Sequence, residues 1–190
     1  MELIISSDGS HTIYLPEIDE TYHSKRGALT ESRYVYIKEG LEKINDKKHI
    51  RVFELGLGTG LNALLSFEFA LNNDIQIDYF SIEKFPLKKE IWEQLNYKNF
   101  FKNPVSDIFN LIHELEWDKE FEIHPLFKFH KSNKSIESIE LDNSSFDIVF
   151  YDAFAPKKQS EIWEIQKLEK IWNLLNNEGF LVTYCANGEF

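Results

Sequence analysis

Cysteine is almost absent from this sequence, and its scarcity excludes two ways of stabilising a small fold. The 190 residues include a single cysteine, Cys185, so neither an internal disulfide framework nor a cysteine-rich zinc site is possible. Proline and glycine are also sparse, with five and eight residues, and the chain contains no repeat or low-complexity linker. We therefore expect one ordinary globular domain.

Long apolar runs are missing as well. No stretch approaches the roughly 20 residues of a membrane helix, so no membrane partner is expected. The opening residues, MELIISSDGS, lack the basic region and long apolar core of a signal peptide. Because 43% of the residues are hydrophobic and 15% aromatic, the chain can form a real core. These features predict a soluble cytoplasmic protein.

Positive charge is the third shortage. Lysine and arginine number 21 against 32 acidic residues, which gives a formal net charge of −11. Broad nucleic-acid binding needs a positive surface, so this composition argues against it but leaves room for a local basic patch. The basic residues that cluster in sequence are Lys25, Arg26, Arg33, Lys157 and Lys158. Each cluster is either part of a solvent-exposed face or a local basic patch that contacts nucleic acid.

The first 45 residues are predicted to form a hairpin and a helix. Two short β-rich runs flank Asp8 and Gly9, a strong turn dipeptide. A helix is expected from Thr30 to about Lys43, with Thr30 as its cap and Glu31 in its first turn.

From about residue 46 the pattern alternates between strands and helices. Strands are predicted over 50–58, 77–84, 121–130, 146–154 and 179–185, with Pro125 interrupting the third. Helices are predicted over 61–71, 87–95, 105–113 and 160–175. The last helix has an apolar stripe of Ile162, Ile165, Leu168, Ile171, Trp172 and Leu175. This alternation predicts an α/β fold with a mostly parallel sheet, which binds ligands at the carboxyl ends of its strands.

A glycine-rich segment, ELGLGTGLN, follows the first of these strands. Gly56, Gly58 and Gly60 allow a tight turn and a close approach of the backbone to a ligand. Their spacing differs from the G-x-G-x-x-G of dinucleotide sites. The carboxylate of Glu54 can face the positive amino-acid end of S-adenosylmethionine, directly or through water. The alternative is a glycine turn that serves only the fold.

Glu83 ends the next strand, about 20 residues beyond the glycine loop, where an acidic side chain suits a ribose diol. By itself it could be a surface glutamate. Together with the glycine loop it predicts a nucleoside-containing cofactor, and the glycine spacing favours S-adenosylmethionine over NAD.

The segment FDIVFYDAFAPKK carries Asp152 at the end of a buried strand, beside the expected methyl sulfonium. A carboxylate there could orient an attacking amine or accept its proton. Phe154 and Pro156 could form an apolar wall against a flat substrate. The alternative is that Asp152 caps the following helical segment. His124 and His130 have no companion ligands at metal spacing, so no metal site is predicted.

Four segments together resemble the methyltransferase family that completes 5-methylaminomethyl-2-thiouridine at the tRNA wobble position. They are DGSHTIYLPEIDETYHSKRGALTESRYVYI, ELGLGTGLN, SIEKFPL and YDAFAPKKQSEIW, and the resemblance runs from about Asp8 to Phe190. TYHSKRGALTES and DAFAPKK are much more specific than the glycine loop. Some bacteria fuse this enzyme to an FAD-dependent oxidase. The resemblance implies the stand-alone form here, with a separate oxidase acting upstream.

The resemblance also implies roles for individual residues. Asp152 would be catalytic. Contacts to S-adenosylmethionine would come from Glu54, Gly56, Gly58, Thr59, Gly60, Asn62, Glu83, Lys84, Phe85 and, in place of the usual acidic residue near adenine, Asn133. The substrate pocket would be shaped by Tyr22, His23, Ser24, Arg26, Glu31, Phe154, Pro156 and Lys157.

The hypothesis that follows is methyl transfer from S-adenosylmethionine to the amine of 5-aminomethyl-2-thiouridine in the anticodon loop of tRNA. The tRNA contacts would concentrate on the basic clusters. Two rivals stay open: a small-molecule N-methyltransferase or aminopropyltransferase on the same fold, and a non-catalytic module that binds S-adenosylmethionine. We expect a Rossmann-like core over 46–190 with an N-terminal lid over 1–45. The final helix and strand pair of the family fold are expected to be missing.

Overall fold

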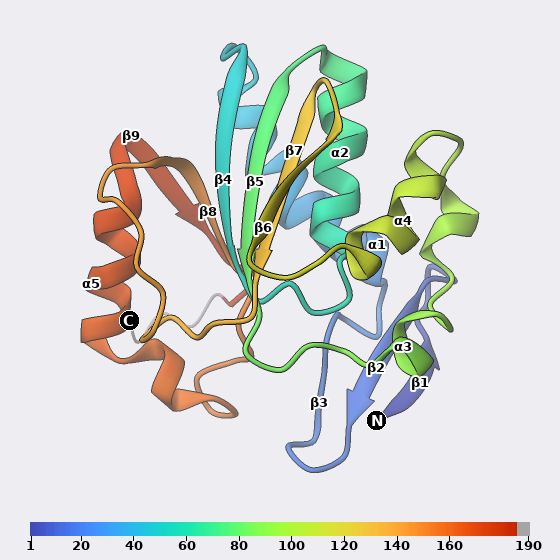
Figure 1. Ribbon diagram of the computed structural model, residues 1–190. Helices are drawn as coiled ribbons and strands as arrows, with labels where there is room; N and C mark the ends of the chain where they lie inside the picture. The colour runs from blue at the N-terminus through green and yellow to red at the C-terminus, as the bar shows by residue number, and fades with distance from the viewer. Residues whose placement is uncertain (186–190) are drawn as a thin grey trace.

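The computed structural model describes residues 1–185, which form two sheets with helices packed around the larger one (Figure 1). The predicted core extends to residue 190, so its last five residues lie outside this description. The larger sheet has the strand order β6-β7-β5-β4-β8-β9. In that order the strands are Lys119–His124, Phe127–Ser132, Gln76–Ile82, His49–Leu55, Phe146–Tyr151 and Leu175–Val182. All neighbouring pairs are parallel except β6 with β7. The predicted α/β fold with a mostly parallel sheet is confirmed.

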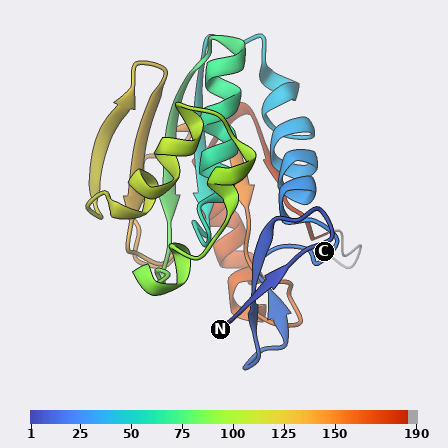
Figure 2. The same ribbon diagram turned by 90° about the vertical axis from the view of Figure 1, so that its right-hand side faces the viewer.

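Helical segments cover both faces of this sheet (Figures 1 and 2). One apolar cluster joins the sheet to α1 (Ala28–Ser32), η1 (Arg33–Lys38), η2 (Leu41–Ile44), α2 (Leu61–Asn73), α3 (Lys89–Trp92), η3 (Tyr97–Phe100) and α4 (Val105–Glu114). A second cluster joins the opposite face to η4 (Ser160–Trp163) and α5 (Ile165–Leu174). Every residue of β8 is buried, as expected for a central strand covered on both faces. Within residues 1–185, no helix has the length and apolar character needed to cross a membrane.

The smaller sheet is antiparallel and consists of β1 (Glu2–Ile5), β2 (His11–Leu15) and β3 (Glu20–Thr21). It lies at the end of the molecule where the parallel strands terminate (Figure 1). Hydrogen bonds fix it there. The Tyr97 hydroxyl donates to the His11 carbonyl at 2.8 Å, and the His11 N–H donates to Asn96 at 2.8 Å. The predicted hairpin around Asp8 and Gly9 is confirmed, and the N-terminal sheet lies beside the carboxyl edge of the larger sheet.

The predicted helix from Thr30 to about Lys43 is wrong as a single α-helix. The chain forms the short helix α1, then the π-helix η1, then the 3-10 helix η2. Thr30 is not the cap, because α1 starts after Gly27, whose φ of 155° favours glycine. Asp8 acts as a remote cap instead, since its carboxylate accepts the Thr30 N–H and hydroxyl, both at 2.9 Å.

The predicted broken strand over 121–130 is wrong as well. Residues 119–124 and 127–132 form two antiparallel strands, β6 and β7, joined by a turn at Pro125 and Leu126. Proline has no N–H for a sheet ladder and a fixed φ, so it reverses the chain here rather than interrupting one strand.

The apolar stripe predicted over 160–175 is only partly correct. Ile171 is buried, but Ile165 and Trp172 are 74% and 69% exposed. The segment is not one helix, because Glu164 is extended, with ψ near 143°, and resets the helical phase between η4 and α5. Strand β9 also begins at Leu175, earlier than the predicted start at residue 179.

Candidate functional site

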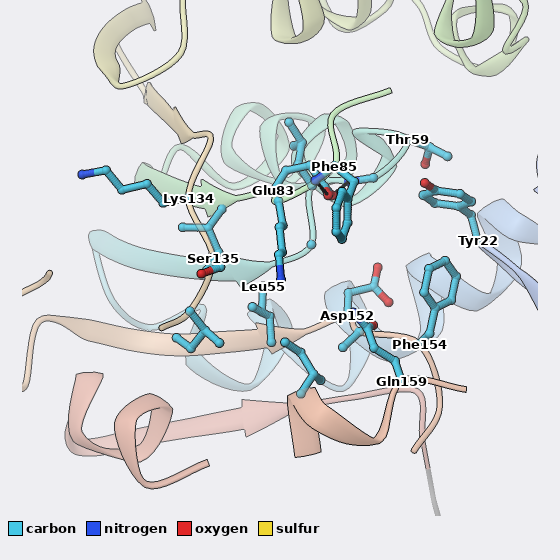
Figure 3. Close-up of a pocket in the computed structure, with 18 of the residues that line it drawn as sticks. Tyr22, Leu55, Thr59, Glu83, Phe85, Lys134, Ser135, Asp152, Phe154 and Gln159 are labelled. Carbon is cyan, nitrogen blue, oxygen red and sulfur yellow. Dashed lines mark hydrogen bonds between the residues drawn. The ribbon is translucent and has the colours of Figure 1, made fainter. Parts of the chain in front are cut away.

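A cavity opens at the carboxyl ends of β4, β5 and β8, next to the glycine loop and the N-terminal sheet (Figure 3). It encloses about 820 Å³, including space open to solvent. The predicted site residues that line it are Tyr22, His23, Gly56, Gly58, Thr59, Glu83, Lys84, Phe85, Asp152 and Phe154. Segments far apart in sequence thus meet at the edge of the sheet where parallel-sheet folds bind ligands.

The glycine loop passes close to its neighbours at this edge. Gly56 has a φ of 95°, and a Cβ there would lie 2.7 Å from the backbone carbonyl oxygen of Asp152. Gly58 has a φ of 48°, and a Cβ there would lie 3.1 Å from the Tyr22 ring. The Gly56 N–H donates to the Ile82 carbonyl at 2.9 Å, which ties the loop to the end of β5. Larger residues at these positions would strain the backbone and displace the cavity lining.

Glu83 is held by the backbone around it. One carboxylate oxygen accepts the Gly58 N–H at 3.0 Å, and the other accepts the Phe85 N–H at 2.8 Å. Burial raises the pKa of Glu83, while these two hydrogen bonds lower it. Each oxygen keeps a further lone pair. The carboxylate is therefore oriented, lines the cavity, and can accept two hydroxyl groups such as those of a ribose diol.

Asp152 is held by two side chains. Its Oδ1 accepts the Tyr36 hydroxyl at 2.6 Å, and its Oδ2 accepts the Asn62 amide at 2.7 Å. Burial raises the pKa of Asp152 to about 7, and the charges of Glu31 and Glu83 also raise it, while the two hydrogen bonds lower it. A carboxyl group with a pKa near neutrality can both accept and release a proton under physiological conditions.

Glu54 lies behind the cavity wall rather than in it. It is 0% exposed, and its oxygens accept the Asn62 amide at 3.1 Å and the Ser81 hydroxyl at 2.7 Å. Burial, together with the charge of Asp152, raises the pKa of Glu54 to about 8, although the hydrogen bonds from Ser81 and Asn62 lower it. The Asn62 Nδ2 therefore donates to both carboxylates. The structure links Glu54 to the cavity through Asn62 and Asp152.

Aromatic side chains surround the space beside Asp152 (Figure 3). The rings of Tyr22 and Phe154 pack edge to face, with centroids 5.3 Å apart. Phe85 also lines the cavity and is 66% exposed. Such a wall suits a flat, partly apolar group.

His23 is buried and joins the N-terminal sheet to the glycine loop. Its Nε2 and the Thr59 hydroxyl are hydrogen-bonded at 2.6 Å. His113 contacts the carbonyl of the same threonine through Nε2 at 3.1 Å. Burial lowers the pKa of both imidazoles to about 4, so both are neutral at pH 7. The neutral His23 ring ties the loop to the N-terminal sheet through this hydrogen bond to Thr59.

Several predicted site residues do not line the cavity: Ser24, Arg26, Glu31, Glu54, Gly60, Asn62, Asn133, Pro156 and Lys157. The Asn133 amide instead donates to the Glu83 carbonyl at 2.9 Å. Glu31 accepts the Ser24 N–H at 2.9 Å, and Gly60 starts α2. Most of these residues support the lining from behind, whereas Arg26 and Lys157 are exposed.

Sequence reasoning missed part of the lining: Leu55, Leu57, Ile82, Lys134, Ser135, Ile136, Ala153, Gln159, Ile162 and Tyr184. Lys134, Ser135 and Ile136 follow the end of β7, and Tyr184 follows the end of β9. The rule that ligands bind at the carboxyl ends of parallel strands would have identified these four positions.

The basic clusters differ in how free their charges are. Arg33 pairs with Glu68 at 2.8 Å and Lys158 with Asp19 at 3.8 Å. The Lys25 ammonium lies 5.0 Å from the centre of the Tyr14 ring.

The family model described as S-adenosyl-L-methionine-dependent methyltransferase matches residues 88–190. Among curated proteins, an uncharacterized protein of Methanocaldococcus jannaschii is 27% identical over 186 residues, covering 97% of this chain and 50% of that protein. The tRNA 5-methylaminomethyl-2-thiouridine biosynthesis bifunctional protein MnmC of Marinomonas sp. is 25% identical over 187 residues, covering 90% of this chain and 27% of that protein.

Among solved structures, MnmC2 from Aquifex aeolicus matches with a TM-score of 0.78 and 25% identity, covering 97% of this chain and 59% of that one. The chain thus spans half or less of the length of these two curated relatives. The agreement in fold extends over nearly all of the chain.

Proposed function

The chain belongs to the S-adenosyl-L-methionine-dependent methyltransferase family, with S-adenosylmethionine as its cofactor, and we propose that it methylates a wobble uridine in tRNA. The acceptor would be the primary amine of 5-aminomethyl-2-thiouridine. Two relatives support this choice: the Marinomonas protein is named for biosynthesis of 5-methylaminomethyl-2-thiouridine, the product that this methylation would give, and the Aquifex structure is titled MnmC2. The observation that carries the proposal is Asp152, a carboxylate of near-neutral pKa in the wall of the cavity.

The cavity residues fit the cofactor. Glu83 would accept the two ribose hydroxyls, and the glycine loop leaves room for the backbone to contact the ligand closely. Lys134, Ser135 and Ile136, which follow β7, would flank the adenine. The cofactor supplies a methyl group on a positively charged sulfur, with the bonding pair staying on the sulfur. The acidic groups at this edge favour that positive charge.

Asp152 would act on the amine. A primary alkyl amine is an ammonium ion at neutral pH, and the carboxylate attracts and orients it. One ammonium N–H bond breaks as an O–H bond forms on Asp152, which frees the nitrogen lone pair for attack. Tyr22 and Phe154 would hold the flat base beside the carboxylate. Fixing the amine in line is worth up to roughly 7–11 kcal/mol of the barrier.

The tRNA would approach the exposed side of the cavity. A base in a single-stranded anticodon loop can be splayed out at small cost. Two exposed cations, Lys84 and Lys134, line this cavity, and two more, Arg26 and Lys157, are exposed three residues beyond the lining residues His23 and Phe154. Arg33 and Lys158 are committed to acidic partners, so we assign the phosphate contacts to the four exposed cations rather than to the whole of the basic clusters.

The proposal is tested by incubating the protein with methyl-labelled S-adenosylmethionine and tRNA that lacks the final wobble methyl group, followed by digestion and identification of the labelled nucleoside. We expect label in 5-methylaminomethyl-2-thiouridine. Label in small amines from a panel, with none in tRNA, would favour a small-molecule methyltransferase. Cofactor binding without any methylated product would favour a non-catalytic module.

A further inference from the structure

Two carboxyl groups share one amide in this protein: Glu54, which is fully buried, and Asp152, which is partly buried in the cavity wall. Asn62 is 2% exposed, and its Nδ2 lies 3.1 Å from Glu54 Oε1 and 2.7 Å from Asp152 Oδ2. The amide has two hydrogens, so one serves each carboxylate. The Asn62 Oδ1 is buried and has no hydrogen-bond partner. Ionisation of one carboxyl group therefore affects the other, both through the shared amide donor and through direct repulsion between the charges.

The surroundings of this pair are acidic or neutral. The charges of Glu31 and Glu83 raise the pKa of Asp152. The charge of Asp152 in turn raises the pKa values of three tyrosine hydroxyls, those of Tyr36, Tyr79 and Tyr184. Ser81 bonds Glu54 from β5. Because two such carboxylates cannot both be charged cheaply in a buried site, the pair carries one negative charge over a range of neutral pH.

The location of that charge decides whether the site can take a proton from a substrate. Charge on Asp152 faces the cavity, whereas charge on Glu54 lies in the interior, where no substrate amine can reach it. Each carboxyl group accepts one hydroxyl, Asp152 from Tyr36 and Glu54 from Ser81 at 2.7 Å, but the phenol of Tyr36 is more acidic than the alcohol of Ser81 and is therefore the stronger donor. The Tyr36 ring is 1% exposed, and its hydroxyl donates to Asp152 at 2.6 Å. A hydrogen bond to the charged form favours ionisation of the group that accepts it.

We propose that Tyr36 is a positioning residue that places the single negative charge of the Glu54–Asn62–Asp152 unit on Asp152, where it can accept a proton from the substrate amine. This rests on the proposed function for the identity of the substrate. The proton leaves an ammonium nitrogen and joins a carboxylate oxygen, so the step needs no further reactant. Nothing in the chemistry requires Tyr36 to touch the substrate.

The test measures the ¹³C chemical shifts of the carboxyl carbons in the cofactor-free protein as a function of pH, which gives a titration midpoint for each group. The variants Asp152→Asn and Glu54→Gln assign the signals, because each removes one of them. In Tyr36→Phe we expect the Asp152 midpoint to rise by about one pH unit, because a hydrogen bond to the charged form is lost. We expect the Glu54 midpoint to fall, because the charge moves inward. A purely structural role would not move two groups in opposite directions.

The double variant Tyr36→Phe/Glu54→Gln provides the rescue. Glutamine keeps the shape of Glu54 but cannot hold the charge, so the Asp152 midpoint should return part of the way to its wild-type value. Tyr14→Phe is the matched control, since Tyr14 also donates to an aspartate, Asp19 at 2.9 Å, but lies outside the cavity lining. It should leave both midpoints unchanged.

Turnover gives the second readout. In Tyr36→Phe the acid limb of the pH–kcat profile should move up by about one pH unit, and kcat at pH 7 should fall about fivefold, because the ionised fraction of Asp152 falls from about a half to about a tenth. Cofactor affinity should change less than about twofold, because the hydroxyl does not line the cavity. Unchanged carboxyl midpoints in Tyr36→Phe would overturn the inference. Absence of any methylated amine from the wild-type protein would overturn the proposed function, while the carboxyl titrations would still decide the role of Tyr36.

Discussion

Glu83 and Asp152 end strands on either side of β4, and their different surroundings suit different tasks. Backbone N–H groups hold both oxygens of Glu83, so its orientation follows from the loop that carries it. Side-chain donors on η1 and α2 hold Asp152 instead. The first arrangement is typical of a fixed acceptor for ligand hydroxyls, and the second allows tuning of proton affinity.

Two conservative substitutions test the roles of Asp152 and Glu83 separately. Asp152→Asn should reduce turnover by about 10²–10⁴-fold, because an amide cannot accept the proton, and should leave the cofactor Kd nearly unchanged. Glu83→Gln should raise the cofactor Kd by about tenfold, because one acceptor for the ribose is lost. Calorimetric binding and single-turnover product analysis measure the two effects. Full turnover in Asp152→Asn would refute the catalytic role of that residue.

At the scale of elements, the loop between β4 and α2 is constrained by what lies beside it. Gly56 combines a φ of 95° with a Cβ position 2.7 Å from the Asp152 carbonyl oxygen. Gly9, in the turn between β1 and β2, has a similar φ of 83°, but the nearest atom to its Cβ position is 3.8 Å away. The two glycines therefore share the backbone strain and differ in the clash.

Comparing Gly56→Ala with Gly9→Ala isolates the contribution of that close approach. Both variants should lose about 1 kcal/mol of unfolding free energy through backbone strain, and Gly56→Ala should lose a further 1–3 kcal/mol, roughly, through the clash. Gly56→Ala should also weaken cofactor binding, whereas Gly9→Ala should not. Denaturant unfolding and calorimetry measure these changes, and equal losses in the two variants would contradict the steric argument.

Across the whole molecule, buried ionisable groups make stability depend on pH in opposite directions. Burial raises the pKa values of Asp152 and Glu54 to about 7 and about 8. Their contribution to the stability of the folded protein is therefore lost as pH rises from about 4 through these values. Burial lowers the pKa values of His23 and His113 to about 4, so their contribution is lost as pH falls below about 6.5. Between about pH 4 and 6.5 the two trends oppose each other and nearly cancel, so stability should fall mainly above about pH 6.5.

The contribution of Glu54 to the loss of stability at higher pH can be separated from that of Asp152. Wild-type Tm should fall as pH rises from about 6.5 to 8, and Glu54→Gln should reduce that fall, because glutamine stays neutral. Its amide oxygen can accept the Asn62 N–H, and its amide N–H can donate to the Ser81 hydroxyl oxygen in place of the present bond. Thermal unfolding followed by circular dichroism over this range makes the measurement. A parallel decline in both proteins would show that Glu54 does not ionise in that interval.

The sequence alone determined the class of fold and the edge at which the site lies. Alternating strands and helices predict a mostly parallel sheet, and Gly56, Glu83 and Asp152 each follow a strand of that sheet. Carboxyl ends of parallel strands share one edge, so residues at these positions must come together. Local patterns were also sufficient for the turn at Asp8 and Gly9.

Only the tertiary structure decided which side chains face the ligand and what charge they carry. Glu54 and Asp152 look alike in sequence, yet one is fully enclosed and the other lines the cavity. Tyr36 is 116 positions from its partner Asp152, and no local pattern links them. Burial, shared donors and neighbouring charges arise from packing between distant segments, and these long-range effects set the proton affinities on which the proposed chemistry depends.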